Sequence, residues 1–122
     1  MQLGMIGLGR MGGNIVRRLM RNGHTAVVYD KDAKAVAGLA SEGAAGATTL
    51  EEFVGKLEKP RTAWIMLPAG HITETTIEAI AKLMEKGDVI IDGGNTFWQD
   101  DVRRGKALKD RGIHYEIGRA HV

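Results

Sequence analysis

The chain has 122 residues, of which 43% are hydrophobic, and its 17 Lys and Arg against 15 Asp and Glu give a formal net charge of +2. This length and apolar content suffice for one hydrophobic core and exclude a disordered chain. No cysteine is present, which excludes a disulfide framework and a thiolate metal site. We therefore expect a cytoplasmic protein without a metal site. Because charges of both signs are scattered, we expect no nucleic-acid partner. Glycines interrupt the first apolar stretch, so we expect neither a signal peptide nor a membrane anchor.

Strand patterns alternate with helical patterns along the chain. The first helix carries Met11, Ile15 and Leu19 on one stripe, which we expect to face the core. In chain order the predicted elements are strand 2–6, helix 10–22, strand 25–29, helix 33–41, strand 44–46, helix 50–57, strand 62–67, a helix that Thr73 or Thr75 caps and Gly87 follows, strand 88–92, helix 99–111 and strand 113–115. Because such alternation needs right-handed crossovers between parallel strands, the sequence predicts a single α/β domain with a doubly wound parallel sheet.

A glycine motif joins the first strand to the first helix. It reads Met5-Ile6-Gly7-Leu8-Gly9-Arg10-Met11-Gly12. A dinucleotide pyrophosphate needs a tight strand-to-helix turn, backbone that it can approach without a Cβ in the way, and N–H groups at the start of a helix, and the three glycines meet these needs in order. Asp30 follows about 20 positions later, at the end of the second strand, as the Rossmann fingerprint requires. The context favours a dinucleotide site over an ordinary glycine-rich loop.

Four predicted strand ends gather Gly, Pro, Asn and Asp residues. They are residues 7–12, Asp30, residues 67–70 and residues 92–95. In a doubly wound sheet, ligands bind outside the carboxyl ends of the strands, so we expect these segments to form one continuous site. Taken alone, residues 92–95 are equally compatible with a simple turn, because Gly and Asn tolerate positive φ.

The glycine motif, with Gly23-His24 ahead of the second strand, resembles the β-hydroxyacid dehydrogenase superfamily. Within that superfamily, Asp92-Gly93-Gly94-Asn95-Thr96, followed by Trp98, Asp100, Arg103 and Arg104, resembles decarboxylating 6-phosphogluconate dehydrogenase. Met66-Leu67-Pro68-Ala69-Gly70 resembles that family's loop beside the nicotinamide. The resemblance covers about residues 1–115. The alternatives are a 3-hydroxyisobutyrate-type dehydrogenase domain, whose relatives usually carry a Ser/Thr-containing segment at residues 92–95, and a non-catalytic nucleotide-binding module.

The resemblance implies an enzyme that oxidises the C3 hydroxyl of 6-phosphogluconate with a nicotinamide cofactor and releases carbon dioxide and ribulose 5-phosphate. It implies that Asn95 touches both cofactor and substrate, a role that suits an amide because it both donates and accepts. The implied cofactor-binding residues are Gly7, Leu8, Gly9, Arg10, Met11, Gly12, Asp30, Lys31, Leu67, Pro68, Ala69 and Asn95. The family's proton-transferring Lys and Glu belong to a helical, dimer-forming second domain, so we expect no catalytic residue in this chain and a homo-oligomer for the complete enzyme.

Asp30 bears on the choice of cofactor. A carboxylate there accepts hydrogen bonds from ribose hydroxyls and repels a 2′-phosphate, which favours NAD. Family members that prefer NADP tend to have a neutral residue followed by Arg, and here Lys31 keeps only the positive charge of the second position. We expect NAD, with NADP as the alternative.

The sequence divides into a dinucleotide-binding domain over residues 1–115 and a tail over residues 116–122. The family continues its sixth strand into a Ser-Gly-Gly-type loop, whereas residues 117–122 read Ile-Gly-Arg-Ala-His-Val. These six residues match an in-frame translation of a common sequencing-adapter oligonucleotide. We therefore expect a non-native tail on a truncated chain that lacks the second domain.

Overall fold

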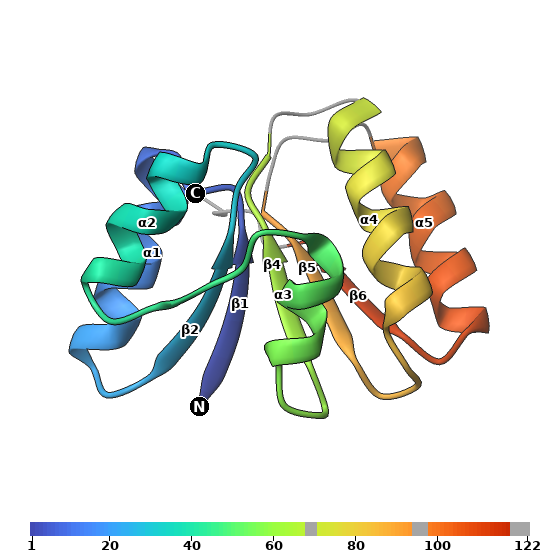
Figure 1. Ribbon diagram of the computed structural model, residues 1–122. Helices are drawn as coiled ribbons and strands as arrows, with labels where there is room; N and C mark the ends of the chain where they lie inside the picture. Colours follow the sequence, from blue (N-terminus) through green and yellow to red (C-terminus); the bar gives the residue numbers. More distant parts are fainter. Residues whose placement is uncertain (68–70, 94–97, 118–122) are drawn as a thin grey trace.

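The computed structural model describes residues 1–67, 71–93 and 98–117, and within these residues the strands form one six-stranded sheet (Figure 1). The strand order is β3-β2-β1-β4-β5-β6, and every neighbouring pair is parallel. The elements are β1 (Gln2–Ile6), α1 (Arg10–Arg21), β2 (Thr25–Tyr29), α2 (Ala33–Ser41), β3 (Ala45–Gly46), α3 (Leu50–Lys56), β4 (Thr62–Ile65), α4 (His71–Leu83), β5 (Val89–Asp92), α5 (Trp98–Asp110) and β6 (His114–Ile117). The predicted doubly wound sheet is confirmed, with the strand order reversing between β1 and β4.

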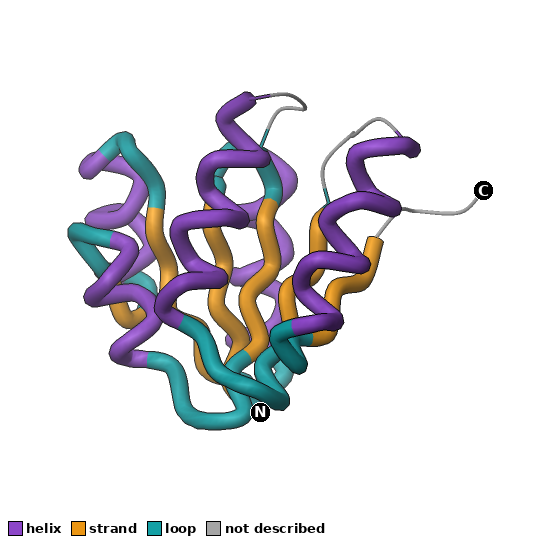
Figure 2. The backbone as a smooth tube through the Cα atoms, turned by 90° about the vertical axis from the view of Figure 1, so that its right-hand side faces the viewer, coloured by secondary structure: helices purple, strands orange, loops and turns teal. Residues whose placement is uncertain are grey.

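Helices cover both faces of the sheet (Figure 2), and the central strands β1 and β2 contribute buried residues to a core on each face. On one face, Leu3 and Met5 of β1 pack with Val16 of α1 and Leu39 of α2. On the other face, α3, α4 and α5 pack against strand residues such as Ile65. A parallel sheet buried in this way needs nearly continuous apolar strands, which is the pattern of β1, β2 and β5.

The face that α1 presents to the sheet differs from the predicted one. Gly12, Gly13 and Val16 are buried, whereas Met11 is 65% exposed. The predicted stripe is therefore wrong at Met11. The helix starts so close to the end of β1 that glycines form its inner face there, and a face without side chains leaves no hydrophobic pattern in the sequence.

Some boundaries also differ. β4 ends at Ile65, because its register partner Ile6 is the last residue of β1. α4 begins at His71, so the predicted Thr cap is wrong: Thr73 lies buried inside the helix. The Thr75 hydroxyl donates to the His71 carbonyl oxygen at 2.9 Å, as helix-interior residues do.

β6 runs further than predicted. It includes Glu116 and Ile117, which pair with Ile91 and Asp92 of β5. These are the first two residues of the predicted tail. The remainder of that tail, residues 118–122, lies outside the described residues.

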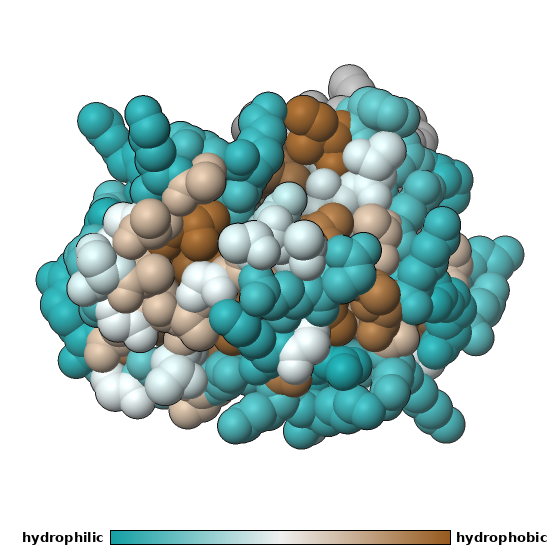
Figure 3. All heavy atoms as spheres, in the orientation of Figure 1, coloured by the Kyte–Doolittle hydropathy of each residue, from teal (hydrophilic) through white to brown (hydrophobic). Residues whose placement is uncertain are grey.

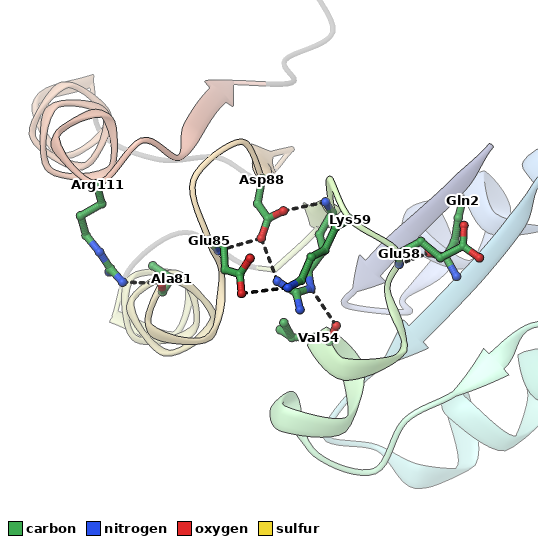
Figure 4. A network of polar contacts seen from close by, with 9 residues as sticks. Gln2, Val54, Glu58, Lys59, Ala81, Glu85, Asp88 and Arg111 are labelled. Carbon is green, nitrogen blue, oxygen red and sulfur yellow. Dashed lines mark hydrogen bonds and ion pairs between the residues drawn. The ribbon is translucent and has the colours of Figure 1, made fainter.

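A buried carboxylate holds the amino ends of β4 and β5 together (Figure 4). Asp88, 1% exposed, accepts hydrogen bonds from the backbone N–H groups of Arg61 at 2.7 Å and Glu85 at 2.8 Å, and from the Arg61 guanidinium at 3.1 Å. Arg61 also donates to the carbonyl oxygen of Val54 at 3.2 Å, which connects the end of α3. Burial by itself raises the pKa of Asp88, but the donors from Glu85 and Arg61 together outweigh it and hold that pKa below its ordinary value.

This network predicts a pH dependence of stability. Because the folded-state pKa of Asp88 is depressed, its stabilisation is complete well above the unfolded-state value of about 3.9 and is lost as the pH falls through the folded-state pKa. We expect Asp88→Asn to lower the free energy of unfolding at pH 7 by about 3 kcal/mol, because it breaks a buried ion pair. The variant's stability should then fall less steeply than wild type on acidification below about pH 5.

Urea denaturation at a series of pH values checks this. The control is Glu78→Gln, which neutralises an exposed carboxylate on α4 and should retain the wild-type slope. Parallel pH profiles for wild type and Asp88→Asn would contradict the assignment.

Candidate functional site

Gly7 makes the bend between β1 and α1. Its φ is 96°, in the region that favours glycine, and a Cβ on it would collide with the carbonyl oxygen of Met66. Its N–H donates to the Tyr29 carbonyl oxygen at 3.0 Å. The bend is therefore held between the ends of β2 and β4, and any side chain at residue 7 would push these strands apart.

Gly12 and Gly9 have different tasks. A Cβ on Gly12 would collide with the carbonyl oxygen of Gly7, so the fold itself requires this glycine. Gly9 is the N-cap of α1, with φ −64°, and a Cβ there would meet no atom within 4 Å. The fold does not need glycine at residue 9, and the space in front of it is open to a ligand.

The start of α1 offers this open space several hydrogen-bond donors. The first N–H groups of a helix have no partner within the helix, and here the N-cap glycine supplies no side-chain cap. The first turn also carries no acidic side chain. Donors of this kind, together with the positive end of the helix dipole, suit a phosphate group.

Asp30 follows β2 and ties two loops together. Its Oδ2 accepts from the Leu8 backbone N–H at 2.7 Å, and its Oδ1 accepts from the Asp32 backbone N–H at 2.8 Å. The first bond fixes the carboxylate beside the glycine turn, and the second is an Asx-turn that directs the chain into α2. Each carboxylate oxygen has a further lone pair, so the group can still accept hydrogen bonds from a ligand's hydroxyls.

A cleft of about 750 Å³ opens at the carboxyl ends of β1, β2, β4 and β5, a volume within the range of cofactor sites. Near its rim Ile72 of α4 is 47% exposed, and hydrophobic surface is visible beside the upper end of α4 (Figure 3). The described residues that line the cleft are Ile6, Gly7, Gly9, Arg10, Met11, Gly12, Tyr29, Asp30, Lys31, Leu50, Met66, Leu67, Ile72, Thr75, Thr76 and Gly93.

Most predicted cofactor residues reach this cleft. Those among its lining are Gly7, Gly9, Arg10, Met11, Gly12, Asp30, Lys31 and Leu67. Leu8 does not line it: its side chain packs in the core beneath α1 and α2, and its N–H donates to Asp30. Pro68, Ala69 and Asn95 lie outside the described residues.

One wall of the cleft was not predicted. Ile72, Thr75 and Thr76 line it from α4, and Leu50 lines it from the start of α3. The spacing of residues 72, 75 and 76 places them on one side of a helix, a signal that was present in the sequence. With Thr73 or Thr75 as the predicted cap, Ile72 falls before the helix, and the pattern of residues 72, 75 and 76 is not recognised.

Gly93, at the carboxyl end of β5, also lines the cleft. The N–H of Gly93 donates to the Ile65 carbonyl oxygen at 2.9 Å, and a Cβ on Gly93 would collide with Trp64 Nε1 and Met66 Sδ. Just before it, Asp92 is fully buried and accepts a hydrogen bond from the Tyr115 hydroxyl at 3.0 Å.

The part of the chain that the structure describes contains no group of three or more His, Asp or Glu side chains that could hold a metal ion. None of its helices is long and apolar enough to cross a membrane. A phosphate-binding helix start, a carboxylate after β2 and a cleft where the strand order reverses together define a dinucleotide-binding domain of the Rossmann type, and its residues fit a nicotinamide dinucleotide.

The comparison with protein families agrees. The family described as the NAD binding domain of 6-phosphogluconate dehydrogenase matches residues 2–116, and the chain belongs to this family.

Relatives with either cofactor preference are similar to this chain. It is 40% identical over 107 residues to the NAD(+)-dependent, decarboxylating 6-phosphogluconate dehydrogenase of Haloferax volcanii, covering 88% of this chain and 36% of the relative. It is 37% identical over 118 residues to the NADP(+)-dependent, decarboxylating 6-phosphogluconate dehydrogenase of Bacillus subtilis, and the match covers 93% of this chain and 25% of the relative. The solved structure of Plasmodium falciparum 6-phosphogluconate dehydrogenase, described in apo form and in complexes with NADP+ and with 6-phosphogluconate, superposes with a TM-score of 0.86 at 31% identity and covers 94% and 26%. The chain thus spans between 25% and 36% of the length of these proteins.

The different tasks of the glycines can be tested separately. We expect Gly9→Ala to fold with wild-type stability, because its methyl group meets open space, but to raise the Kd for NAD about tenfold or more, which corresponds to about 1.4 kcal/mol. We expect Gly12→Ala to lose about 1–3 kcal/mol of stability, because the methyl group meets backbone. Isothermal titration calorimetry and thermal melts measure the two effects.

The matched control is Gly13→Ala, one residue along the same helix. Its Cβ would lie 3.5 Å from the nearest side-chain atom, an ordinary contact, so both affinity and stability should be retained. Unchanged NAD affinity in Gly9→Ala would refute the placement of the pyrophosphate.

Proposed function

We propose that this chain is the cofactor-binding domain of a longer, NAD-dependent enzyme that oxidises and decarboxylates 6-phosphogluconate to ribulose 5-phosphate. Membership of the family and the identity to complete 6-phosphogluconate dehydrogenases support the reaction. The string Asp92-Gly93-Gly94-Asn95 supports this substrate over 3-hydroxyisobutyrate-like ones.

The geometry of the cleft supports one orientation for the cofactor. The adenosine ribose lies against Asp30, the pyrophosphate lies at the start of α1 beside Gly9, and the nicotinamide half extends toward Met66, Leu67 and Gly93. When bound, NAD supplies the hydride acceptor. In this proposal Pro68 and Ala69 contribute to the nicotinamide side, and Asn95 orients the substrate hydroxyl next to it.

The hydrogen bonds of Asp30 are the main support for NAD, and not NADP, as the proposed cofactor. Both carboxylate oxygens are held by backbone N–H groups at 2.7 and 2.8 Å, so the negative charge is fixed at the ribose position and cannot turn away from a 2′-phosphate. A dianionic phosphate beside a fixed carboxylate is repelled. Lys31 is exposed at the cleft and offsets part of this repulsion.

The rest of the proposed enzyme lies beyond this chain. Its proton-transferring Lys and Glu belong to the second domain, and the complete protein is a cytoplasmic homo-oligomer. In this proposal residues 1–115 are the dinucleotide-binding domain and residues 116–122 are a non-native tail, although Glu116 and Ile117 extend β6 and the family match reaches residue 116.

We expect the chain to bind NAD at least about tenfold more tightly than NADP, and Asp30→Asn to narrow this ratio, since one negative charge is lost. Asp30→Asn should also lower the melting temperature, because an amide has one acceptor oxygen for two backbone N–H groups. Calorimetric titration with both cofactors checks the prediction.

Asp32→Asn is the matched control. It removes the same charge two residues away, and it keeps the N-cap of α2, where Asp32 accepts from the Lys34 N–H at 3.0 Å. Its NAD to NADP ratio should equal that of wild type. A tenfold preference of the wild-type chain for NADP would overturn the choice of NAD.

The reaction itself is tested with the longer protein that contains this chain. With 6-phosphogluconate and NAD, we expect NADH and carbon dioxide to form in equal amounts, and 3-hydroxyisobutyrate to support no comparable rate. NADH formation from 3-hydroxyisobutyrate without release of carbon dioxide would overturn the proposed substrate.

A further inference from the structure

We propose that the hydroxyl group of Tyr115 is a positioning group for the nicotinamide half of the cleft. It holds the carboxylate of Asp92, and through Asp92 it fixes Gly93, which forms part of the cleft wall. Tyr115 itself does not line the cleft. The inference rests on the proposed orientation of the cofactor.

A hydrogen bond joins Tyr115 of β6 to Asp92 at the end of β5. Asp92 is the last residue of β5 and is fully buried. The Tyr115 hydroxyl donates to its Oδ2 at 3.0 Å. Tyr115 is the register partner of Ile90, two residues before Asp92, so its side chain reaches along the sheet toward the carboxyl ends of the strands.

Contacts with the core and with α5 also restrict the ring of Tyr115. It packs against the core beneath α3, α4 and α5, and a Cβ on Gly105 of α5 would lie 3.6 Å from its Cδ2. This distance is an ordinary van der Waals contact, so α5 lies over one edge of the ring with room for a methyl group between them. A ring confined between a helix and the sheet keeps its hydroxyl at one place, which is what a positioning group needs.

Asp92 is connected to the cleft through the backbone of Gly93, which follows it and lines the cleft. Gly93 is the next residue, its N–H donates to Ile65, and there is no space for a side chain between it and Met66. Gly93 and Met66 both line the cleft. Loss of a donor to a buried carboxylate costs free energy, and in this proposal the Asp92 side chain and the adjoining Gly93 shift to reduce that cost.

This path concerns one half of the cleft. The adenosine side is held by Asp30 and its bonds to Leu8 and Asp32, which involve neither β5 nor β6. Loss of the Tyr115 hydroxyl should therefore weaken binding of a complete dinucleotide and spare a ligand that lacks nicotinamide. A residue that merely stabilised the fold would affect both ligands equally.

The test is Tyr115→Phe in the 122-residue chain, titrated calorimetrically with NAD and with ADP-ribose. We expect the Kd for NAD to rise about fivefold or more, the lower bound of typical couplings between sites, and the Kd for ADP-ribose to stay within about twofold. The control is His114→Asn, which changes an exposed neighbour on the opposite face of the same strand and should leave both Kd values unchanged.

A second variant tests the path through Asp92. Asp92→Asn keeps the size of the side chain and an acceptor oxygen, and adding Tyr115→Phe to it should raise the Kd for NAD less than Tyr115→Phe does in wild type. If Asp92→Asn does not fold, the positioning role is judged from Tyr115→Phe alone, by whether its Kd for NAD rises more than its Kd for ADP-ribose.

The outcomes separate the two proposals. An equal rise of both Kd values in Tyr115→Phe, or no rise of either, overturns the positioning role while the proposed function stands. A wild-type chain that melts cooperatively and binds neither ligand overturns the proposed function, and the positioning role with it.

Discussion

At Gly7 the backbone that follows β1 lies directly against the backbone that follows β4 and against the start of α1. The carbonyl oxygen of Gly7 lies where a Cβ of Gly12 would be, and the carbonyl oxygen of Met66 lies where a Cβ of Gly7 would be. These two contacts of backbone on backbone let α1 begin directly at the edge of the sheet. This close approach places the start of α1 and the Leu8 N–H, which donates to Asp30, at the edge of the sheet where the cleft opens.

Two carboxylates hold the loops that surround the cleft. Asp30 follows β2 and accepts hydrogen bonds from the backbone N–H groups of Leu8 and Asp32. Asp92 is the last residue of β5 and accepts a hydrogen bond from the Tyr115 hydroxyl of β6. Both lie at the edge of the sheet where ligands bind in this architecture. Loops held in place before a ligand arrives lose less conformational entropy on binding, which favours affinity.

Much of this domain could be predicted from the sequence, because its elements are short, regular and separated by glycines. The parallel sheet follows from hydrophobic period, and the turn at residues 7–12 and the position of Asp30 follow from their spacing, whereas the other predicted residues that line the cleft were implied by the resemblance to the family. The rest depends on contacts between distant residues. The exposure of Met11 arises from the close approach of Gly12 to Gly7, and the α4 wall required knowing that the helix starts at His71.

The role of Asp30 illustrates the same limit. Its position and its charge could be predicted, but the hydrogen bond to Leu8 joins residues 22 positions apart and leaves no periodic signal. The hydrogen bond between Tyr115 and Asp92 joins residues 23 positions apart and likewise leaves no pattern that the sequence reveals. Hydrophobic period indicates which face of an element is buried, and it does not indicate which polar groups meet there.

The buried Asp88 network lies at the amino ends of β4 and β5, on the edge of the sheet opposite the cleft. The network expected to govern the pH dependence of stability is thus spatially separate from the proposed cofactor-binding residues. Substitutions at one edge are expected to combine additively with substitutions at the other. A loss of stability caused by changing the cofactor-choosing Asp30 could therefore be offset by substitutions at the distant edge without altering the cleft.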